Sequence, residues 1–231
     1  VFTKVMELSR ISFIKNSSRE QLKDQKYLEL LTIILGFNCE ELHEQPEIVK
    51  QNLGGLHIWQ YPNQFSKYLL FLQNYAINSY LEIGCRWGGT FIFTTEYLRR
   101  FNDVRSIAVD YIDSPVKEYC QQKNCEFLQL NTRSQDFKDF VKNRSFDLIF
   151  IDGDHSYLGV KNDFQACRYS GKIFVFHDII NMACQGVVNF WNDLKEKEKD
   201  QFKFFEFLDQ YDEVVTRTGN TYLGIGVAVK I

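Results

Sequence analysis

The sequence predicts an α/β fold with a doubly wound, mostly parallel sheet. From residue 79 onward, short β-branched or apolar runs alternate with segments of helical periodicity, which is typical of parallel strands joined by crossover helices. Two of these runs, residues 146–151 and 172–177, are almost continuously apolar, as expected for strands covered by helices on both faces. We therefore expect these two strands near the middle of the sheet.

The same alternation assigns the elements in order. We expect strands at residues 79–84, 105–110, 125–130, 146–151 and 172–177. We expect helices near residues 89–101, 114–123, 135–142, 157–168 and 184–199. Residues 202–208 and 222–230 then predict an antiparallel strand pair that closes one edge of the sheet, with no helix between them.

We interpret residues 1–60 as an N-terminal helical extension and residues 61–231 as the main domain. Residues 19–36 have the pattern of an amphipathic helix that ends at a glycine C-cap, and residues 46–52 suggest another short helix. The aromatic stretch at residues 54–62 suits either a lid over a substrate or a segment packed onto the domain by its rings.

Composition excludes several classes of protein. The 27 Lys and Arg against 30 Asp and Glu give a net charge of −3, which argues against a nucleic-acid partner. The longest apolar run, residues 27–37, is far shorter than the roughly 20 residues of a membrane span, so we expect no membrane partner. The six Cys lack zinc-finger spacing, which favours reduced thiols and a cytoplasmic location. A homo-oligomer remains compatible with the sequence.

A glycine-rich turn follows the first predicted strand and opens a helix. It reads EIGCRWGGT from residue 82, and glycines let a backbone approach a ligand closely at the free N–H groups of a helix start. The spacing is GxxxGG, whereas a dinucleotide fingerprint needs GxGxxG, so an NAD site is disfavoured. Glu82 suits a cationic ligand better than a pyrophosphate. A plain tight turn is the alternative.

Further polar residues follow the other strands, at the edge where open α/β sheets bind ligands. Asp110 ends the second predicted strand, where an acid can accept both hydroxyls of a ribose. Taken alone, an Asp after a strand is more often a turn or cap residue.

Glu82, the glycines, Asp110 and the SQD at residues 134–136 together resemble the S-adenosylmethionine-dependent methyltransferases, over about residues 55–231. The resemblance implies a Rossmann-like methyltransferase sheet. It also implies that the glycine loop holds the methionine part of the cofactor, that Asp110 binds the ribose and that Ser134 and Gln135 lie beside the adenine. The cofactor-binding residues expected on this basis are Glu82, Gly84, Gly88, Asp110, Ser134 and Gln135. We add Cys85, a neighbour in the glycine loop without an assigned chemical role, and Asp152.

Two further strand ends carry acids. The fourth predicted strand leads into IDGDH at residues 151–155, and the fifth ends in His177 and Asp178. Carboxylates from adjacent strands can meet on one hard cation such as Mg²⁺. The alternatives are a polar turn in which Asp154 caps the following helix, and an interior histidine at residue 177.

The pairing of these two elements resembles the metal-dependent O-methyltransferases that act on sugars and other secondary metabolites. The resemblance implies that Asp152 is a metal ligand and that His155 is the general base. We expect a metal site of Asp152, His177 and Asp178 for Mg²⁺ or Mn²⁺. His177 departs from the commoner acidic pair, and an imidazole that binds directly moves the preference from Mg²⁺ toward Mn²⁺, Fe²⁺ or Zn²⁺. The alternative is that His177 hydrogen-bonds a metal ligand instead.

The sequence thus predicts methyl transfer from S-adenosylmethionine to a hydroxyl of a small molecule, with a sugar or glycosylated metabolite favoured by the resemblance. A catechol or phenol is also open. The competing hypotheses are a catalytically idle nucleotide-binding module and an NAD-dependent oxidoreductase.

Overall fold

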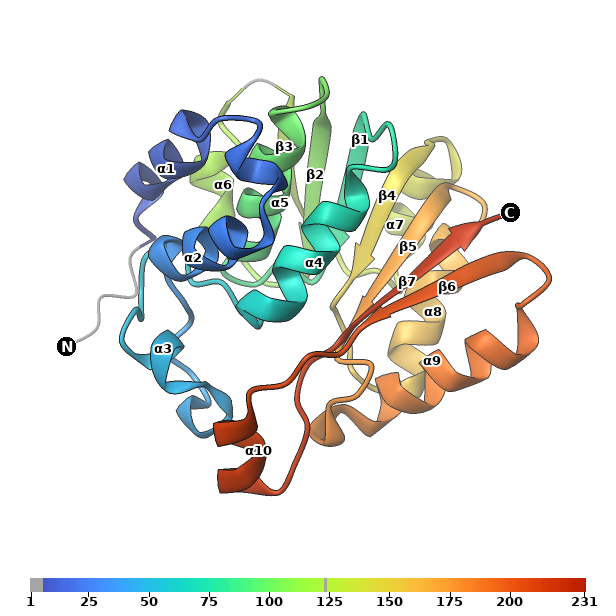
Figure 1. The fold of residues 1–231 in the computed structure, drawn as a ribbon. Coiled ribbons are helices and arrows are strands. Elements are labelled where there is room, and N and C mark those ends of the chain that lie inside the picture. Colours follow the sequence, from blue (N-terminus) through green and yellow to red (C-terminus); the bar gives the residue numbers. More distant parts are fainter. Residues whose placement is uncertain (1–5, 123) are drawn as a thin grey trace.

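A computed structural model (Figure 1) describes residues 6–122 and 124–231 of the chain. A seven-stranded sheet has the order β3-β2-β1-β4-β5-β7-β6. The strands are β1 (Ser79–Ile83), β2 (Arg105–Asp110), β3 (Cys125–Gln129), β4 (Phe146–Ile151), β5 (Gly171–His177), β6 (Phe202–Phe207) and β7 (Ile225–Lys230). Strands β1 to β5 are parallel, whereas β7 pairs antiparallel with both β5 and β6. The predicted fold class, its five parallel strands and the antiparallel pair at one edge are confirmed.

Helices cover both faces of this sheet (Figure 1). On one face lie α1 (Ile11–Asn16), α2 (Gln25–Leu35), α4 (Pro62–Leu72), α5 (Gly89–Arg99) and α6 (Val116–Tyr119). On the other face lie α7 (Gln135–Lys142), α8 (Tyr157–Cys167) and α9 (Gln185–Lys197). The short helices α3 (Glu47–Lys50) and α10 (Asp212–Thr218) lie outside these layers.

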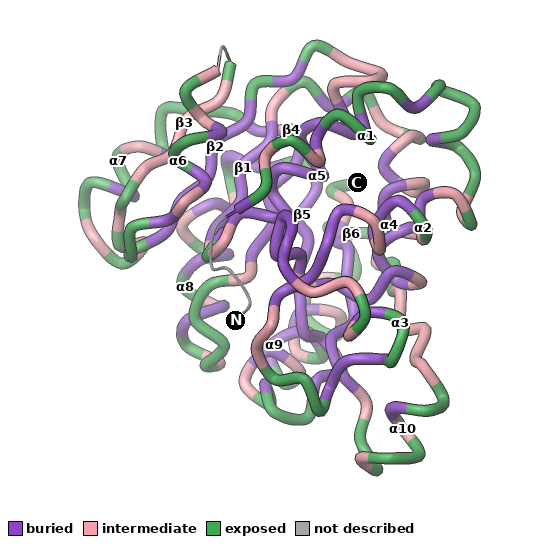
Figure 2. The backbone as a smooth tube through the Cα atoms, turned by 90° about the vertical axis from the view of Figure 1, so that its left-hand side faces the viewer, coloured by how far each residue is buried: buried purple, intermediate pink, exposed green. Residues whose placement is uncertain are grey.

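The central strand β4 shows why its sequence is continuously apolar. Leu148 and Phe150 belong to the hydrophobic cluster under α4 and α5, whereas Ile149 and Ile151 belong to the cluster under α8 and α9. Successive side chains of a strand point to opposite faces, so a strand covered on both sides needs apolar residues at every position. Figure 2 shows the buried strands enclosed by helices that are exposed on their outer sides.

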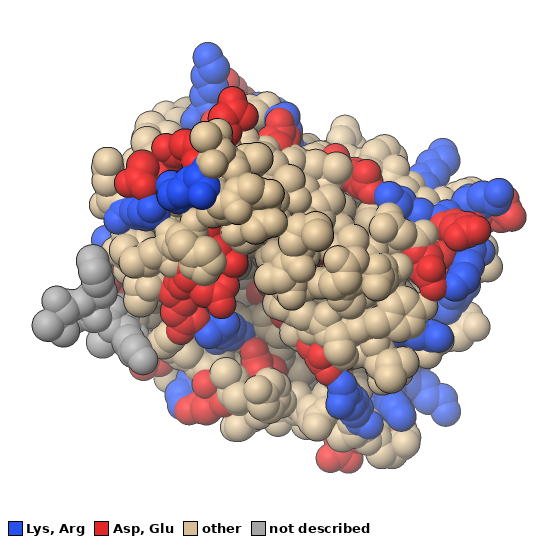
Figure 3. All heavy atoms as spheres, turned by 90° about the horizontal axis from the view of Figure 1, so that it is seen from below, with Lys and Arg blue, Asp and Glu red and all other residues tan. Residues whose placement is uncertain are grey.

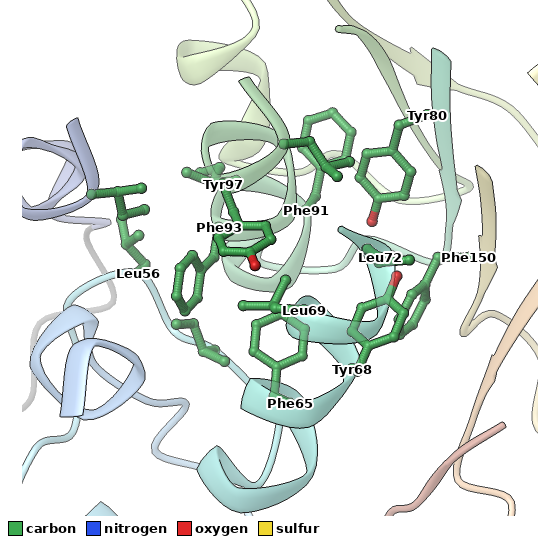
Figure 4. Packing of buried hydrophobic residues seen from close by; sticks show 14 of the residues in the cluster. Leu56, Phe65, Tyr68, Leu69, Leu72, Tyr80, Phe91, Phe93, Tyr97 and Phe150 are labelled. Carbon is green, nitrogen blue, oxygen red and sulfur yellow. The ribbon is translucent and has the colours of Figure 1, made fainter. Parts of the chain in front are cut away.

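Aromatic side chains fill the space between α4, α5 and the sheet (Figure 4). Phe65 of α4 meets Phe93 of α5 edge-on at 5.4 Å between ring centroids, and Tyr80 of β1 stacks on Phe91 at 5.6 Å. The hydroxyl groups of Tyr68 and Tyr80 turn toward one another in this packed layer. Tyr80 donates its hydroxyl hydrogen bond to Glu82, which places a buried polar pair directly beneath the end of β1.

Three expectations about helices need correction. A helix, α10, lies between the last two strands, where none was expected, because Asp212–Thr218 is too short and too rich in β-branched residues to give a clear helical pattern. The helix expected from residue 19 begins at Gln25, since Asp24 accepts a bond from the amide of Tyr27 and caps it there. The helix expected over residues 114–123 is reduced to α6.

The N-terminal helices pack as part of the main hydrophobic cluster. Leu28 and Leu35 of α2 are fully buried in the same cluster as Tyr68 and Phe91. The predicted C-cap is confirmed at Gly36, which has a positive φ of 94°. No helix within residues 6–122 and 124–231 combines the length and apolar character needed to cross a membrane.

Candidate active site

The parallel strands end in one cavity of about 910 Å³. The loops after all five parallel strands line it, together with a segment of the N-terminal region. Figure 3 looks onto the side toward which these strands point in Figure 1, and acidic side chains gather there around a hollow in the surface. The predicted residues that line the cavity are Glu82, Gly84, Cys85, Gly88, Asp110, Asp152, His155, His177 and Asp178.

Glu82 lies at the floor of the cavity and is 2% exposed. Burial raises the pKa of its carboxyl group to about 8, although the bond from Tyr80 acts in the opposite direction. A buried carboxylate costs folding free energy unless a cation or hydrogen-bond donors compensate it. Glu82 is therefore placed to favour a positively charged or hydrogen-donating ligand in the cavity.

The glycine loop wraps around the carboxylate of Asp110. The amide of Arg86 donates to Asp110 Oδ2 at 2.8 Å, and the amide of Ile112 donates to Oδ1 at 3.2 Å. Gly88, with a φ of 87°, caps α5, and a Cβ atom on it would overlap the side chain of Val116. Asp110 is 7% exposed, so it both shapes the loop and presents the rest of its carboxylate to the cavity.

Both arginines among the described lining residues are already paired. Arg86 forms an ion pair with Glu40 from the N-terminal region, and Arg133 forms one with Asp154. These pairs leave Glu82 and Asp110 without an arginine partner, and the lining also holds Glu41 and Asp163, so the cavity has an acidic excess. Such a charge distribution favours a cation over the phosphate groups of a dinucleotide.

Asp152, His177 and Asp178 meet at one end of the cavity. His177 Nδ1 lies 3.2 Å from Asp152 Oδ1 and 3.5 Å from Asp178 Oδ2. One ligand atom from each residue falls within 4.8 Å of the others, a spacing that can hold a metal ion. Asp178 also has a positive φ of 63°, which is strained for a residue with a side chain and is typical of functional sites.

The charges of this cluster compensate one another. Burial would lower the pKa of His177, but the carboxylates of Asp152 and Asp178 raise it to about 10. Burial would raise the pKa of Asp178, but the charge and hydrogen bond of His177 hold it well below its ordinary value. The residues therefore form a tight group of opposite charges, into which a divalent cation would fit by displacing the imidazolium proton.

His155 lies at the open side of this group. Its Nε2 is 3.3 Å from Asp152 Oδ1, and its side chain is 43% exposed, compared with 1% for His177. The bond with Asp152, then the contact with Cys184, raises the pKa of His155 to about 11. The neighbouring carboxylates therefore favour the protonated form of this imidazole.

Ser134 and Gln135 lie outside the residues that line the cavity. Ser134 caps α7 by accepting a bond from the amide of Phe137 at 3.2 Å, and Gln135 donates to Asp139 at 2.9 Å.

Asp154 is not the helix cap that the sequence suggested. Ser156 caps α8 through the amide of Gly159, while Asp154 accepts a bond from the amide of Ser156.

Other lining residues were missed from the sequence. Glu40 and Glu41 come from the N-terminal region, and Asn181 and Cys184 follow β5. None belongs to a recognisable motif, and only the fold brings them to the strand ends. The aromatic stretch at residues 54–62 packs onto the domain, with His57 stacked on Trp87 at 5.1 Å between ring centroids, and its His57 and Trp59 also line the cavity.

Residues 81–179 match the family model of a methyltransferase domain. The match begins within β1 and ends just after β5, so it covers the glycine loop, Asp110 and the cluster of Asp152, His177 and Asp178, called the cation group below. The expectation that the protein is a methyltransferase enzyme is confirmed. A comparison with curated protein sequences finds no match.

Several solved structures share this fold. The cofactor-bound structure of Rv0187 from MTB has a TM-score of 0.56 and 13% identity, over 99% of each chain. The O-methyltransferase TomG from Streptomyces achromogenes, in complex with SAM, has a TM-score of 0.52 and 14% identity, over 97% of this methyltransferase and 96% of TomG. The MycE methyltransferase, in complex with Mg and SAH, has a TM-score of 0.50 and 16% identity, over 77% of this chain and 51% of MycE.

Proposed function

We propose that this methyltransferase transfers the methyl group of S-adenosylmethionine to a hydroxyl group of a small molecule, with a divalent cation bound beside the acceptor. The position of Asp152 carries the proposal. Its backbone packs against Gly84 in the glycine loop, while its carboxylate faces His177 and His155. One cavity therefore offers a place for the methyl donor and, next to it, a place for a cation and an acceptor.

The donor end of the cavity suits S-adenosylmethionine. Glu82 and Asp110 are acids in a cavity without a free arginine among its described lining residues, which suits a sulfonium and a ribose better than a pyrophosphate. The indole N–H of Trp87 is buried without a hydrogen-bond partner and can donate to a polar group of the ligand. The complex of TomG with SAM is consistent with this proposal.

The other end suits a divalent cation. Asp152 and Asp178 offer oxygen ligands for Mg²⁺ or Mn²⁺, and His177 adds an imidazole that favours Mn²⁺ or a later transition metal. A bound cation of this kind lowers the pKa of a hydroxyl group that it binds. The complex of MycE with Mg is consistent with a metal in this fold.

His155 is the residue placed to accept the hydroxyl proton. It is the most exposed of the four residues around the cation group, so it faces the part of the cavity where an acceptor can enter. The bonds with Asp152 and Cys184, together with the charges of Asp152 and Asp178, raise its pKa to about 11. A cation held by these carboxylates would offset the charges that keep the imidazole protonated and would let it act as a base.

The test is methyl transfer from labelled S-adenosylmethionine to a panel of sugars, glycosylated metabolites and catechols, with Mg²⁺, Mn²⁺ or excess EDTA. We expect a methylated product in the presence of Mg²⁺ or Mn²⁺ and no product in excess EDTA. We also expect the Asp178→Asn variant to lose this activity. Asp113→Asn is the matched control, because Asp113 is exposed and pairs with Lys117 outside the cavity lining. Full activity in excess EDTA contradicts the metal, and NAD-dependent oxidation without methyl transfer contradicts the whole proposal.

A further inference from the structure

A second group of potential metal ligands lies beside the cation group and consists of Cys184, His155 and Asp178. Cys184 Sγ lies 3.2 Å from His155 Nδ1 and 3.4 Å from Asp178 Oδ2. The other ring nitrogen of His155, Nε2, lies 3.6 Å from the same carboxylate oxygen of Asp178. One sulfur, one nitrogen and one oxygen atom thus lie within 4.8 Å of one another.

Packing and hydrogen bonds hold these three residues in place. Cys184 is 8% exposed and ends the 3-10 turn Met182–Cys184 that leads into α9. The start of α9 packs closely on the loop after β4, because a Cβ atom on Gly186 would lie 2.5 Å from the carbonyl oxygen of His155. Asn181 donates to Asp178 Oδ1 at 2.9 Å, which leaves Oδ2 facing the sulfur.

The spacing of these donor atoms matches a tetrahedral zinc ion. Zinc–sulfur bonds of about 2.3 Å and zinc–nitrogen bonds of about 2.0–2.1 Å place neighbouring ligand atoms roughly 3.3–3.6 Å apart. The distances of 3.2 Å and 3.4 Å from Cys184 Sγ fall close to this range. A thiolate selects softer cations, whereas the oxygen ligands of Asp152 and Asp178 suit Mg²⁺ or Mn²⁺.

We propose that Cys184, His155 and Asp178 form a second cation site, specific for a thiophilic divalent ion such as Zn²⁺, which shares Asp178 with the group of Asp152 and His177. Binding releases the thiol proton of Cys184 and one ring proton of the His155 imidazolium to solvent, and leaves a thiolate and a neutral imidazole as ligands. One tetrahedral position stays open to the cavity, because three protein residues supply the ligands.

Zn²⁺ bound at this site affects catalysis, a consequence that rests on the proposed function, in which His155 accepts the proton of the acceptor hydroxyl. A His155 that ligates Zn²⁺ cannot accept the proton of the acceptor hydroxyl. Zn²⁺ therefore inhibits methyl transfer while Mg²⁺ or Mn²⁺ supports it, and removing the thiol of Cys184 relieves the inhibition.

Cobalt titration tests the site directly, because thiolate-bound Co²⁺ gives a near-ultraviolet sulfur-to-cobalt absorption band. The titration uses a Cys120→Ser/Cys125→Ser background, since these two partly buried sulfurs lie 2.7 Å apart and could bind Co²⁺ themselves. We expect the band in this protein and its loss when Zn²⁺ is added. Cys184→Ser and Cys184→Ala should both abolish the band, and His155→Gln should weaken Co²⁺ binding by about 10–100-fold or more.

Cys39→Ser is the matched control, because Cys39 is also a partly buried free thiol and is not among the residues that line the cavity. It should keep the band. Circular dichroism shows whether each variant is folded. A folded Cys184 variant that retains the band, or a background protein that never shows it, overturns the proposal. The band needs neither methyl donor nor acceptor, so a protein that shows it but transfers no methyl group contradicts only the proposed function.

Discussion

A Cβ atom on Gly84 would overlap the backbone carbonyl of Asp152, so the glycine loop and the loop after β4 touch with no room for a side chain. The Gly84 amide donates to the carbonyl of Val109 at 2.8 Å, and the Asp152 amide donates to that of Ile83 at 2.8 Å. Strand pairing thus continues one residue beyond β1 and β4. This contact sets the distance between Glu82 at the end of β1 and Asp152 at the end of β4, the two residues that the proposed function assigns to the methyl donor and to the cation.

Gly84→Ala should therefore disturb both ends at once. Gly84 has a φ of 82°, and strain at such a position costs about 1–3 kcal/mol before any steric overlap is counted. We expect a loss of stability in urea unfolding and weaker binding of S-adenosylhomocysteine by calorimetry. Gly219→Ala is the control, because Gly219 has a φ of 72° but nothing within 4 Å of its Cβ position. Equal losses in the two variants would contradict the role of the Gly84 contact.

Asp110→Ala should weaken the binding of S-adenosylhomocysteine by about 1.5–3 kcal/mol, because charge-assisted hydrogen bonds to the ribose are lost. The variant also removes the acceptor for the amides of Arg86 and Ile112, so we expect some loss of stability as well. Calorimetry on Asp110→Ala and on the exposed control Asp113→Ala measures the difference. Unchanged affinity in a folded Asp110→Ala protein would remove Asp110 from the cofactor site.

Glu82→Gln should stabilise the metal-free protein at alkaline pH while weakening the binding of the methyl donor. The pKa of Glu82 is raised by burial from 4.5 to about 8 in the folded state. The wild type therefore loses stability as the pH rises from about 4.5 to about 8, whereas a neutral Gln gives no such loss. Urea unfolding across this range in EDTA should show a growing advantage for Glu82→Gln. The exposed Glu126→Gln variant should show none, and a flat difference for Glu82→Gln would contradict the raised pKa.

His155→Ala should lower kcat by about 10²–10⁴, which is the usual effect of removing a positioned acid or base. The affinity for S-adenosylhomocysteine should hardly change, because His155 faces the acceptor side of the cation group. The acid limb of the pH–rate profile should disappear with the imidazole. His43→Ala, at an exposed position outside the cavity lining, should behave as the wild type. A His155→Ala enzyme with wild-type kcat and an intact acid limb would show that a group other than His155 takes the hydroxyl proton.

Local pattern was enough to predict the sheet, because doubly covered strands such as β4 need apolar residues at each position. The strand ends carried the visible motifs, and Glu82, Asp110, Asp152 and Asp178 do meet in one cavity. The missed helix α10 has seven residues and little periodicity, so nothing local distinguishes it from a loop.

Contacts between residues far apart in the chain could not be predicted from the sequence, for a different reason. Glu40 reaches Arg86 and Cys184 reaches His155 only because the chain folds back over the strand ends. The SQD motif at residues 134–136 shows the opposite limit. Ser134 has a clear local function as the cap of α7, and a motif with such a function gives no information on whether a ligand also lies near it.

The central claim is that one cavity binds the methyl donor and a divalent cation together, and a thermal-shift measurement tests it most directly. A ligand at 100 times its Kd adds about 2.7 kcal/mol to the stability of the folded state. We predict that S-adenosylhomocysteine raises the Tm, that Mn²⁺ raises it further, and that Asp178→Asn loses only the second shift. A Tm that rises with NAD, and does not change with S-adenosylhomocysteine in the presence or absence of Mn²⁺, would contradict the claim.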